Sequence, residues 1–356
     1  MAYSWPRASP PPSPAGPHVV ESPLFERVGS GVRCLVCRRR CTLREGAWGL
    51  CKNRFAKGGK LYVATYGLLS AAESRPMEIK PMYHFYPRTS ALTISGWGCN
   101  FPCAWCQNWH LSKVVVYSGA YTPPERVVEW ALENGDSGIN VSFNEPTMLL
   151  EYTVDVFKRA AGLHKSINTN GYLTREALDA LIAAGMEGAN VDLKGGPETY
   201  RRWLAADFHG VVDTIQYLWG RGVHVEVTYL VIPGVNDHEA DAVVEAVAKV
   251  DRSIPLHITA FRPAHLMPHV PPTPVQLLEE IWQRARRELD YVYVGNVPGH
   301  KAQHTYCPKC GALLIKRFAD RVVEVKLDGK RCPKCGHEIK IRGHIGHYGN
   351  LYRQFI

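Results

Sequence analysis

The sequence of 356 residues lacks any run of about eighteen apolar residues, the length that a membrane-spanning helix needs. It also lacks a basic start followed by an apolar stretch, which a secretory signal peptide would show. Six prolines stand among the first eighteen residues instead, so we expect residues 1–18 to be a disordered tail. These absences favour a cytoplasmic protein.

Long runs of like charge are also missing. The formal net charge is +9, yet Arg38–Arg40 is the only unbroken run of three basic residues. A basic proteome or an acidic protein partner would explain this charge as well as nucleic acid would. The charge therefore does not indicate a nucleic-acid partner.

Cysteine, by contrast, is plentiful and grouped. The eleven cysteines form a central triad, an N-terminal group of four and a C-terminal group of four. An odd total without a secretion signal argues against disulfides and for three metal centres in a reducing compartment. The groups are Cys99, Cys103 and Cys106; Cys34, Cys37, Cys41 and Cys51; and Cys307, Cys310, Cys332 and Cys335.

The central triad has the spacing C-x3-C-x2-C and follows the apolar run 91–95. Thiolates are soft ligands that suit iron-sulfur clusters, and a loop can wrap around a cube of iron and sulfide. Three thiolates would leave one iron open for a ligand that is not protein. A zinc ion or a disulfide with a spare thiol fits less well, because structural zinc takes four ligands.

The triad, with Trp105 directly before Cys106, resembles the signature of the radical S-adenosylmethionine (SAM) superfamily. The resemblance implies that the three cysteines are catalytic and hold a 4Fe-4S cluster whose open iron chelates SAM. It further implies that the reduced cluster cleaves SAM to a 5′-deoxyadenosyl radical, which abstracts hydrogen from a substrate. Trp105 would then flank the adenine.

Between residues 90 and 296, apolar strand-like runs alternate with amphipathic helical stretches, a rhythm typical of a parallel sheet. We predict an α/β fold, a partial (β/α)6 TIM-like barrel of the kind that the superfamily has. The predicted strands are Ala91–Ser95, Gly138–Phe143, His164–Asn168, Gly188–Asp192, His224–Val231, Leu256–Phe261 and Tyr291–Val294. Helices are expected near 124–133, 146–162, 174–185, 197–220, 236–250 and 274–289.

Polar residues follow these strands at the edge where barrel chemistry gathers. Asn144 and Glu145 come after the second strand, where the superfamily usually has a Gly-Gly-Glu motif. The resemblance implies that Glu145 contacts the SAM amino group. In the alternative reading, Asn144 and Thr147 only cap the next helix.

Two further strand ends resemble those of pyruvate formate-lyase activating enzyme. Asn168 and Asn170 follow the third strand, and Asp192 and Lys194 follow the fourth. The resemblance implies that the first pair lies along the SAM ribose and that Lys194 meets the SAM carboxylate. The alternative for the second pair is a solvated strand end.

Arg262 and His265 follow the sixth strand, near the expected position of the substrate. Both are candidates for substrate contacts. A histidine at a strand end can equally be a hydrogen-bonded surface residue.

The two outer cysteine groups predict small metal modules. In the N-terminal group, with spacing C-x2-C-x3-C-x9-C, four thiolates suit zinc or an auxiliary iron-sulfur cluster. The paired C-P-K-C-G motifs of the C-terminal group indicate a zinc ribbon. We expect a module and connector over 19–89, the barrel over 90–299, and the ribbon and tail over 300–356.

Read together, residues 83–87, 106–109, 144–147, 191–195 and 295–299 resemble the radical SAM protein of the AmmeMemoRadiSam system. The resemblance implies Memo-like and AMMECR-like partners, a low-potential ferredoxin or flavodoxin type of electron donor, and an activity similar to glycyl-radical activases or other protein modification. The alternative is an inactive zinc or iron-sulfur protein that binds nucleic acid or a protein partner. The intact triad with Glu145 and Lys194 favours the enzyme.

Overall fold

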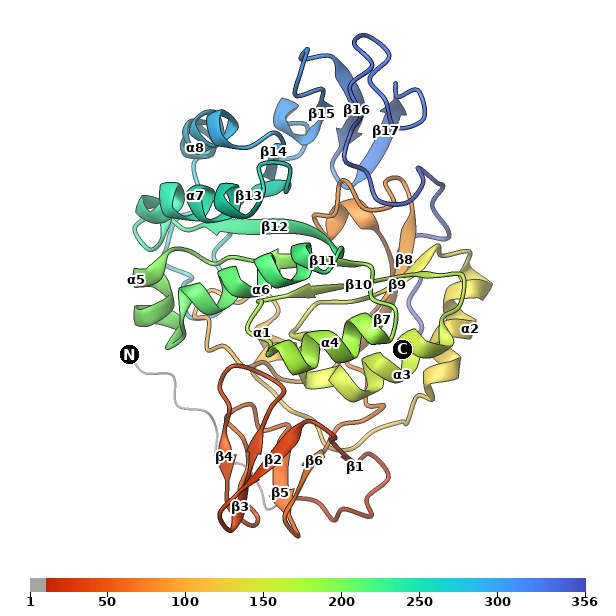
Figure 1. The fold of residues 1–356 in the computed structure, drawn as a ribbon, viewed down its shortest axis with the longest axis vertical. Helices are drawn as coiled ribbons and strands as arrows, with labels where there is room; N and C mark the ends of the chain where they lie inside the picture. The colour runs from red at the N-terminus through yellow and green to blue at the C-terminus, as the bar shows by residue number, and fades with distance from the viewer. Residues whose placement is uncertain (1–10) are drawn as a thin grey trace.

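The computed structural model describes residues 11–356 and is built around one eight-stranded sheet (Figure 1). Its strands lie in the order β14-β13-β12-β11-β10-β9-β8-β7, and all neighbours from β8 to β14 are parallel. The parallel strands are β8 (Ser90–Ser95), β9 (Gly138–Val141), β10 (His164–Thr169), β11 (Gly188–Asp192), β12 (His224–Val231), β13 (Leu256–Ala260) and β14 (Val292–Gly295). The seven predicted strands are therefore confirmed, with ends that differ by a few residues.

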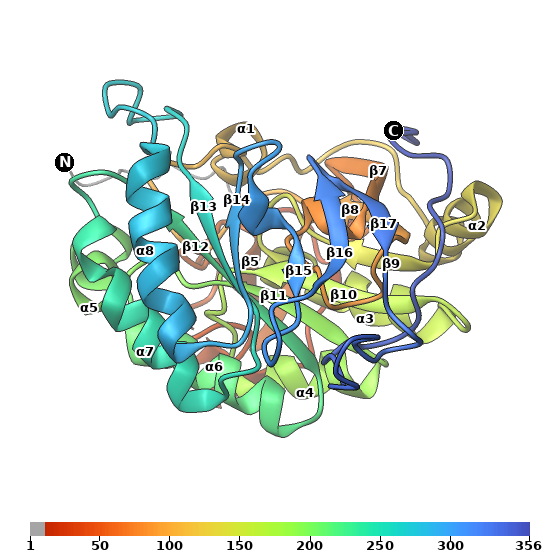
Figure 2. The same ribbon diagram turned by 90° about the horizontal axis from the view of Figure 1, so that it is seen from above.

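The helices that connect these strands cover the outer face of the sheet (Figure 2). Each presents an apolar face to the strands; in α8, for example, Leu278, Ile281 and Ala285 are buried at helical spacing. The main helices are α2 (Pro124–Asn134), α3 (Leu150–Arg159), α4 (Arg175–Ala183), α6 (Phe208–Gly220), α7 (Ala240–Val250) and α8 (Val275–Glu288). The shorter ones are η1 (Met77–Ile79), α1 (Trp109–Ser112), η2 (Pro146–Leu149), η4 (Asp237–Glu239) and η5 (Lys301–Gln303).

The single helix predicted over 197–220 is wrong. The segment contains α5 (Pro197–Thr199) and the π-helical turn η3 (Tyr200–Leu204), and then Ala205 adopts a left-handed φ of +46°. Asp207 begins α6, because its carboxylate accepts hydrogen bonds from the first backbone N–H groups of that helix. A local cap thus divides a stretch that is amphipathic throughout.

Strand β7 (Ala71–Pro76) completes the sheet by pairing antiparallel with β8. The sequence predicted an extended connector in this region. It did not predict that the connector pairs with the central sheet. The C-terminal tail runs beside β7, where Phe355 N donates to Ala72 O at 2.9 Å and Ser74 N donates to Arg353 O at 3.0 Å. The tail therefore covers a sheet edge that would otherwise be exposed.

The two small cysteine-bearing parts lie at opposite ends of the central layer in Figure 1. The N-terminal part has two three-stranded sheets, β1-β6-β5 and β2-β3-β4. Their strands are β1 (Val20–Glu21), β2 (Phe25–Val28), β3 (Gly31–Cys34), β4 (Thr42–Leu43), β5 (Arg54–Lys57) and β6 (Lys60–Val63). The C-terminal part is the sheet of β15 (Thr305–Tyr306), β16 (Leu313–Phe318) and β17 (Arg321–Val325).

Arg317 of β16 attaches the C-terminal part to the segment that precedes β8. Its side chain is 1 % exposed, lies over the Tyr83 ring at 4.1 Å, and donates to Tyr83 O at 2.9 Å and Thr305 Oγ1 at 2.7 Å. A buried guanidinium with these partners fixes the sheet against the segment that leads into the barrel.

A disordered tail was predicted over residues 1–18, and residues 1–10 of this segment lie outside the described residues. Residues 13–19 form turns closed by backbone hydrogen bonds, and His18 O accepts from Tyr66 N at 2.9 Å. Within residues 11–356, no helix combines the length and the apolar character needed to cross a membrane.

Candidate functional site

The central cysteine triad lies in the loop after β8, at the C-terminal edge of the parallel strands. Cys99 and Cys103 are buried, and Cys106 is half-buried. Gly98 begins the loop with a φ of +89°, a conformation that favours glycine. Burial raises the pKa of the Cys99 thiol to about 12 and also raises that of Cys103. These thiols hold their protons until a metal displaces them.

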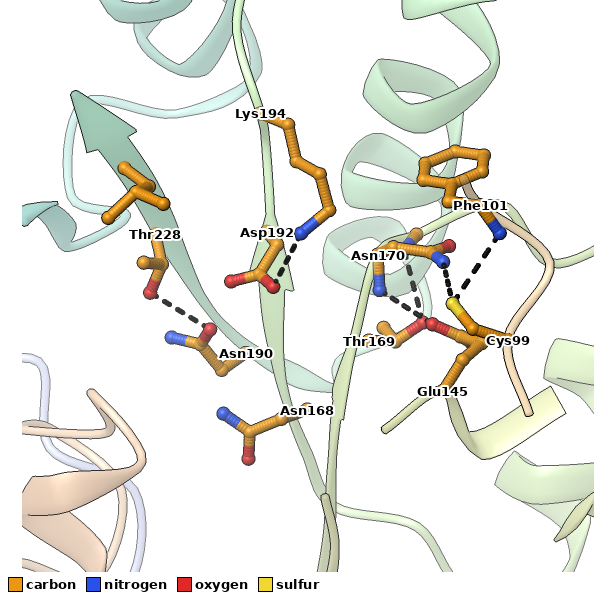
Figure 3. A network of polar contacts seen from close by, with 12 residues as sticks. Cys99, Phe101, Glu145, Asn168, Thr169, Asn170, Asn190, Asp192, Lys194 and Thr228 are labelled. Carbon is orange, nitrogen blue, oxygen red and sulfur yellow. Dashed lines mark hydrogen bonds and ion pairs between the residues drawn. The ribbon is translucent and has the colours of Figure 1, made fainter. Parts of the chain in front are cut away.

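Glu145 accepts hydrogen bonds from η2, from the last residue of β10 and from the loop after β10, and Figure 3 shows the last two. Its Oε1 accepts from Thr169 Oγ1 at 2.9 Å and Thr147 N at 3.3 Å, and Oε2 accepts from Asn170 N at 2.8 Å. Burial raises the pKa of this carboxyl to about 7. The three donors leave one of the roughly four lone-pair sites of a carboxylate for a further donor, such as an amino group.

Asn170 links Glu145 to the cysteine loop, as Figure 3 shows. Its Nδ2 donates to Asn100 Oδ1 at 2.7 Å and lies 3.8 Å from Cys99 Sγ, while its Oδ1 accepts from Tyr172 N at 3.0 Å. The amide is thereby held in one orientation, with an N–H group directed at a thiol of the triad.

Asn168 makes its contacts elsewhere. Its Nδ2 donates to Lys80 O at 2.8 Å, and its Oδ1 accepts from Asn140 Nδ2 at 3.1 Å. The neighbouring Asn190 likewise donates to Pro81 O at 2.7 Å. The structure thus joins Asn168 to the segment that precedes β8, and its contact with a ribose stays a prediction.

Lys194 follows β11 and forms an ion pair with Asp192, with 3.0 Å between Nζ and Oδ2 (Figure 3). Burial favours the neutral amine, but the Asp192 carboxylate outweighs this effect and raises the pKa of Lys194. The backbone is fixed as well, because Lys194 N donates to Tyr200 OH at 3.2 Å and Lys194 O accepts from Asn236 Nδ2 at 2.8 Å. A fixed cation therefore stands near the triad.

Lys113 also belongs to this site, although the sequence pattern did not predict it. Its side chain is buried, Nζ donates to Phe101 O at 2.6 Å inside the cysteine loop, and its charge acts on the thiols of Cys99 and Cys103. No motif marks a lysine at this position. Only the fold brings it beside the thiols, where its charge would offset that of thiolates.

Asn144 fixes the backbone at the start of the cysteine loop through hydrogen bonds. Its Nδ2 donates to Gly96 O at 2.8 Å and to Gly98 O at 2.9 Å. Its Oδ1 is buried and has no hydrogen-bond partner among the described residues. The alternative in which Asn144 caps the next helix is wrong, because the side chain that accepts from Thr147 N is that of Glu145.

Trp105 lies in the hydrophobic core. It is 3 % exposed and meets Trp203 edge-to-face, with 6.1 Å between ring centroids. This packing anchors the loop between the second and third cysteines of the triad. Its place beside an adenine stays a prediction.

The two predicted substrate contacts are separated. Arg262 is exposed and lines a cavity of about 270 Å³ beside the cysteine loop, whereas His265 stacks on Trp109 with 5.7 Å between ring centroids. The cavity is also bounded by strand ends, η1 and the turn between β16 and β17. Its polar lining includes Glu78, Gln107, His257, Thr259, Asn296 and Asp320.

Glu78 makes stability depend on pH. It is 3 % exposed, it accepts from Arg88 N at 2.8 Å, and burial raises its pKa from 4.5 to about 7. Because the folded-state pKa is the higher one, the stability that this group contributes below about pH 4.5 is lost as pH rises to about 7. We expect Glu78→Gln to be more stable than the wild type, and this difference in the free energy of unfolding should grow by up to about 3 kcal/mol from pH 5 to pH 8. Unfolding of both proteins at both pH values measures this, and a difference independent of pH would contradict it.

The two outer cysteine groups are also assembled. All four C-terminal sulfurs lie within 4.8 Å of one another, and Cys307–Cys335 and Cys310–Cys332 are each 3.6 Å apart. This group could hold a metal ion. The four N-terminal cysteines line a single cavity.

Comparisons with known proteins indicate the superfamily of the chain. The sequence pattern of the radical SAM superfamily matches residues 93–247. An uncharacterized protein of Methanocaldococcus jannaschii, MJ0808, is 38% identical over 332 residues, which span 90% of this chain and 99% of that protein. Pyruvate formate-lyase 1-activating enzyme of Escherichia coli K12 is 26% identical over 157 residues, 41% of this chain and 62% of that enzyme.

Among solved structures, a domain of pyruvate-formate lyase-activating enzyme from Bacteroides vulgatus superposes with a TM-score of 0.39 and 19% identity. The superposition covers 45% of this chain and 99% of that domain. The superfamily pattern begins in β8 and includes the cysteine triad, Glu145 and Lys194. The chain therefore belongs to the radical SAM superfamily and is an enzyme.

Proposed function

We propose that Cys99, Cys103 and Cys106 hold the 4Fe-4S cluster that membership of the superfamily implies, and that Glu145 and Lys194 bind SAM beside it. The observation that carries this proposal is the convergence of three thiols, one carboxylate and one ammonium group from separate strand ends. The SAM amino group would meet Glu145, and the SAM carboxylate would meet Lys194.

The residues present fit both groups. Three soft thiols with no fourth cysteine in their loop suit a cluster with one open iron, and Lys113 offsets the negative charge. The lone-pair site left on Glu145 and the unpartnered Asn144 Oδ1 supply acceptors for an amino group. One carboxylate and one ammonium thus match the two charged ends of the amino-acid part of SAM.

When bound and reduced, the cluster and SAM supply a 5′-deoxyadenosyl radical that takes a hydrogen atom from the substrate. The chain's own residues position and protect this chemistry. Asn144 and Lys113 hold the cysteine loop, and Asn170 directs an N–H group at Cys99. The burial of Cys99, Cys103 and Glu145 excludes the water that would otherwise quench a radical.

We further propose that the substrate enters the cavity that Arg262 and Gln107 line. Gln107 follows Cys106 directly, so a group in this cavity stands beside the triad. The lining carries both signs of charge, from Arg262 and Asp320, which suits a polar peptide segment. The similarity to an enzyme named for activating pyruvate formate-lyase also supports a protein substrate, modified as by glycyl-radical activases.

Other finer assignments belong to the same proposal. The short sulfur–sulfur distances of the C-terminal group support a zinc ribbon. We also propose membership of the AmmeMemoRadiSam system with its Memo-like and AMMECR-like partners, a ferredoxin or flavodoxin type of reductant, and a cytoplasmic location. The division at residues 89/90 and 299/300 remains the proposed domain organisation.

The test is reductive cleavage of SAM by anaerobically reconstituted protein. With dithionite we expect 5′-deoxyadenosine to accumulate with time, as measured by liquid chromatography and mass spectrometry. Protein that carries a full cluster yet forms no 5′-deoxyadenosine would contradict the proposal and favour a binding protein.

Arg262→Ala should separate SAM cleavage from hydrogen abstraction. Incubation with an extract of cells grown in deuterated medium should yield deuterated 5′-deoxyadenosine with the wild-type protein. We expect at least about a tenfold lower deuterated fraction with Arg262→Ala, because a charged hydrogen bond to substrate is worth about 1.5–3 kcal/mol. Arg287→Ala, on the exposed face of α8, is the matched control and should behave as wild type. Equal deuteration by the two variants would show that the cavity does not receive substrate.

A further inference from the structure

The N-terminal cysteine group packs directly against the loop that holds the central triad. Cys51 O lies 3.5 Å from the position of a Cβ on Gly98, and Lys52 O accepts from Tyr117 OH at 2.7 Å. On the other side, Arg38 N donates to Tyr172 O at 2.9 Å, just beyond Asn170. The group therefore touches both loops that build the SAM site.

Sulfur spacing sets the C-terminal cysteine group apart from the other two. Across residues 11–356, only the C-terminal group brings three or more metal-ligand atoms within 4.8 Å of one another. Tetrahedral zinc with Zn–S bonds of about 2.3 Å needs sulfurs roughly 3.8 Å apart, as the C-terminal group nearly shows. The thiolates on a cubane stand farther apart, roughly 6 Å, because each binds a different iron. The N-terminal thiols, like those of the central triad, do not reach the narrow spacing that the C-terminal group shows.

The space between the N-terminal thiols is built to receive a charged group. Cys34, Cys37, Cys41 and Cys51 line one cavity together with Arg39, Arg54 and Asn100. Arg39 donates to three backbone carbonyls, among them Asn100 O at 3.2 Å, so no carboxylate neutralises it through these bonds. Its charge is therefore available to offset that of thiolates.

Asn100 joins this cavity to the central triad. It is 1 % exposed, follows Cys99 directly, and accepts from Asn170 through its Oδ1. Its Nδ2 faces the Cys37 thiol and has no partner at normal hydrogen-bond geometry in the described part of the chain. A buried amide N–H of this kind suits the sulfur of a cluster, which accepts longer hydrogen bonds.

We propose that Cys34, Cys37, Cys41 and Cys51 hold a second iron-sulfur cluster, which passes electrons to the one at the central triad. This role rests on the proposed function of the triad. One electron enters the second cluster from a reduced low-potential one-electron carrier protein and leaves toward the Cys99 loop. No bond forms or breaks, no proton moves, and the second cluster returns to its starting oxidation state after each transfer.

The test counts metal in a variant without the triad. Anaerobically reconstituted Cys99→Ala/Cys103→Ala/Cys106→Ala should keep about four iron and four sulfide ions per chain, with an electron paramagnetic resonance signal on reduction. Cys34→Ser/Cys37→Ser should lose the electron paramagnetic resonance signal that the triad variant shows, and should keep only the signal of the cluster at the triad. A colourless triad variant with two zinc ions per chain would overturn the proposal.

Metal analysis of the wild-type protein is a second test, and this test does not depend on whether a variant folds. We expect about eight iron ions and one zinc ion per chain, against about four and two if the N-terminal group binds zinc. Reduced wild type should also show spin-coupling broadening that each variant lacks, and its absence in protein with both clusters reduced would contradict the electron path. If the triad held no cluster, Cys34→Ser/Cys37→Ser would instead lose all of its iron. This result would contradict the proposed function of the triad and is distinct from a failure of the second-cluster proposal.

Discussion

Cys103→Ala should abolish reductive cleavage of SAM, with 5′-deoxyadenosine formation at least about a thousandfold below wild type. The reason is that two thiolates cannot hold a cubane whose fourth corner is already open. Cys103 is buried, and its thiol interacts with Lys194, Lys113 and Cys106, so its loss also removes the sulfur at the centre of the site. Product formation under dithionite, normalised to protein, measures the effect.

His110→Ala is the matched control for this variant. His110 is exposed in α1, four residues after the last cysteine of the triad. This variant should keep its iron and its activity. If Cys103→Ala formed 5′-deoxyadenosine at the rate of His110→Ala, the triad would not be the catalytic centre.

Lys194→Met should weaken SAM binding by about 10- to 100-fold, because a hydrogen bond to a charged group is worth roughly 1.5–3 kcal/mol. Methionine keeps the length of the side chain and removes the ammonium group. It also leaves Asp192 without the partner that lies at 3.0 Å, near thiolates of like charge. Equilibrium binding of labelled SAM to oxidised protein measures the dissociation constant without any turnover.

Two further variants make this result specific. Lys158→Met removes an exposed lysine of α3 and should bind SAM as wild type does. Lys194→Arg keeps the charge and should recover part of the affinity. Unchanged binding by Lys194→Met at full iron content would exclude Lys194 as the partner of the SAM carboxylate.

The parallel sheet could be predicted from sequence because its strands are short apolar runs at regular spacing. In β13, for example, all five residues are buried, and the apolar Leu256, Ile258 and Ala260 alternate with two polar residues. The candidate site could be predicted from the positions of these strands, because Glu145 and Lys194 each come just after a strand. Polar residues at successive strand ends of a parallel sheet meet at one edge.

What the sequence did not reveal depends on contacts between distant segments. Strand β7 reads Ala-Ala-Glu-Ser-Arg-Pro, without an apolar pattern, and it is a strand because β8 offers it an edge. Lys113 is an ordinary lysine in sequence and becomes part of the site only when its loop folds back over Phe101. The break before α6 had a local signal, since Asp207 is a typical N-cap residue.

The two outer cysteine groups adjoin different parts of the proposed site. The N-terminal module contacts the cysteine loop through Arg39 and Asn100, and the C-terminal sheet contributes Asp320 to the cavity beside Gln107. One module therefore adjoins the proposed site of electron transfer, and the other adjoins the proposed site of the substrate.

Electron-nuclear double resonance with SAM labelled by ¹⁵N at its amino group tests whether SAM binds the open iron of the cluster at the triad. In reduced wild-type protein, we expect a hyperfine coupling between this nitrogen and a cluster held by Cys99, Cys103 and Cys106, and we expect no coupling in Cys103→Ala. Wild-type protein that binds SAM and carries a reduced cluster, yet shows no such coupling, would show that SAM is not bound to this cluster.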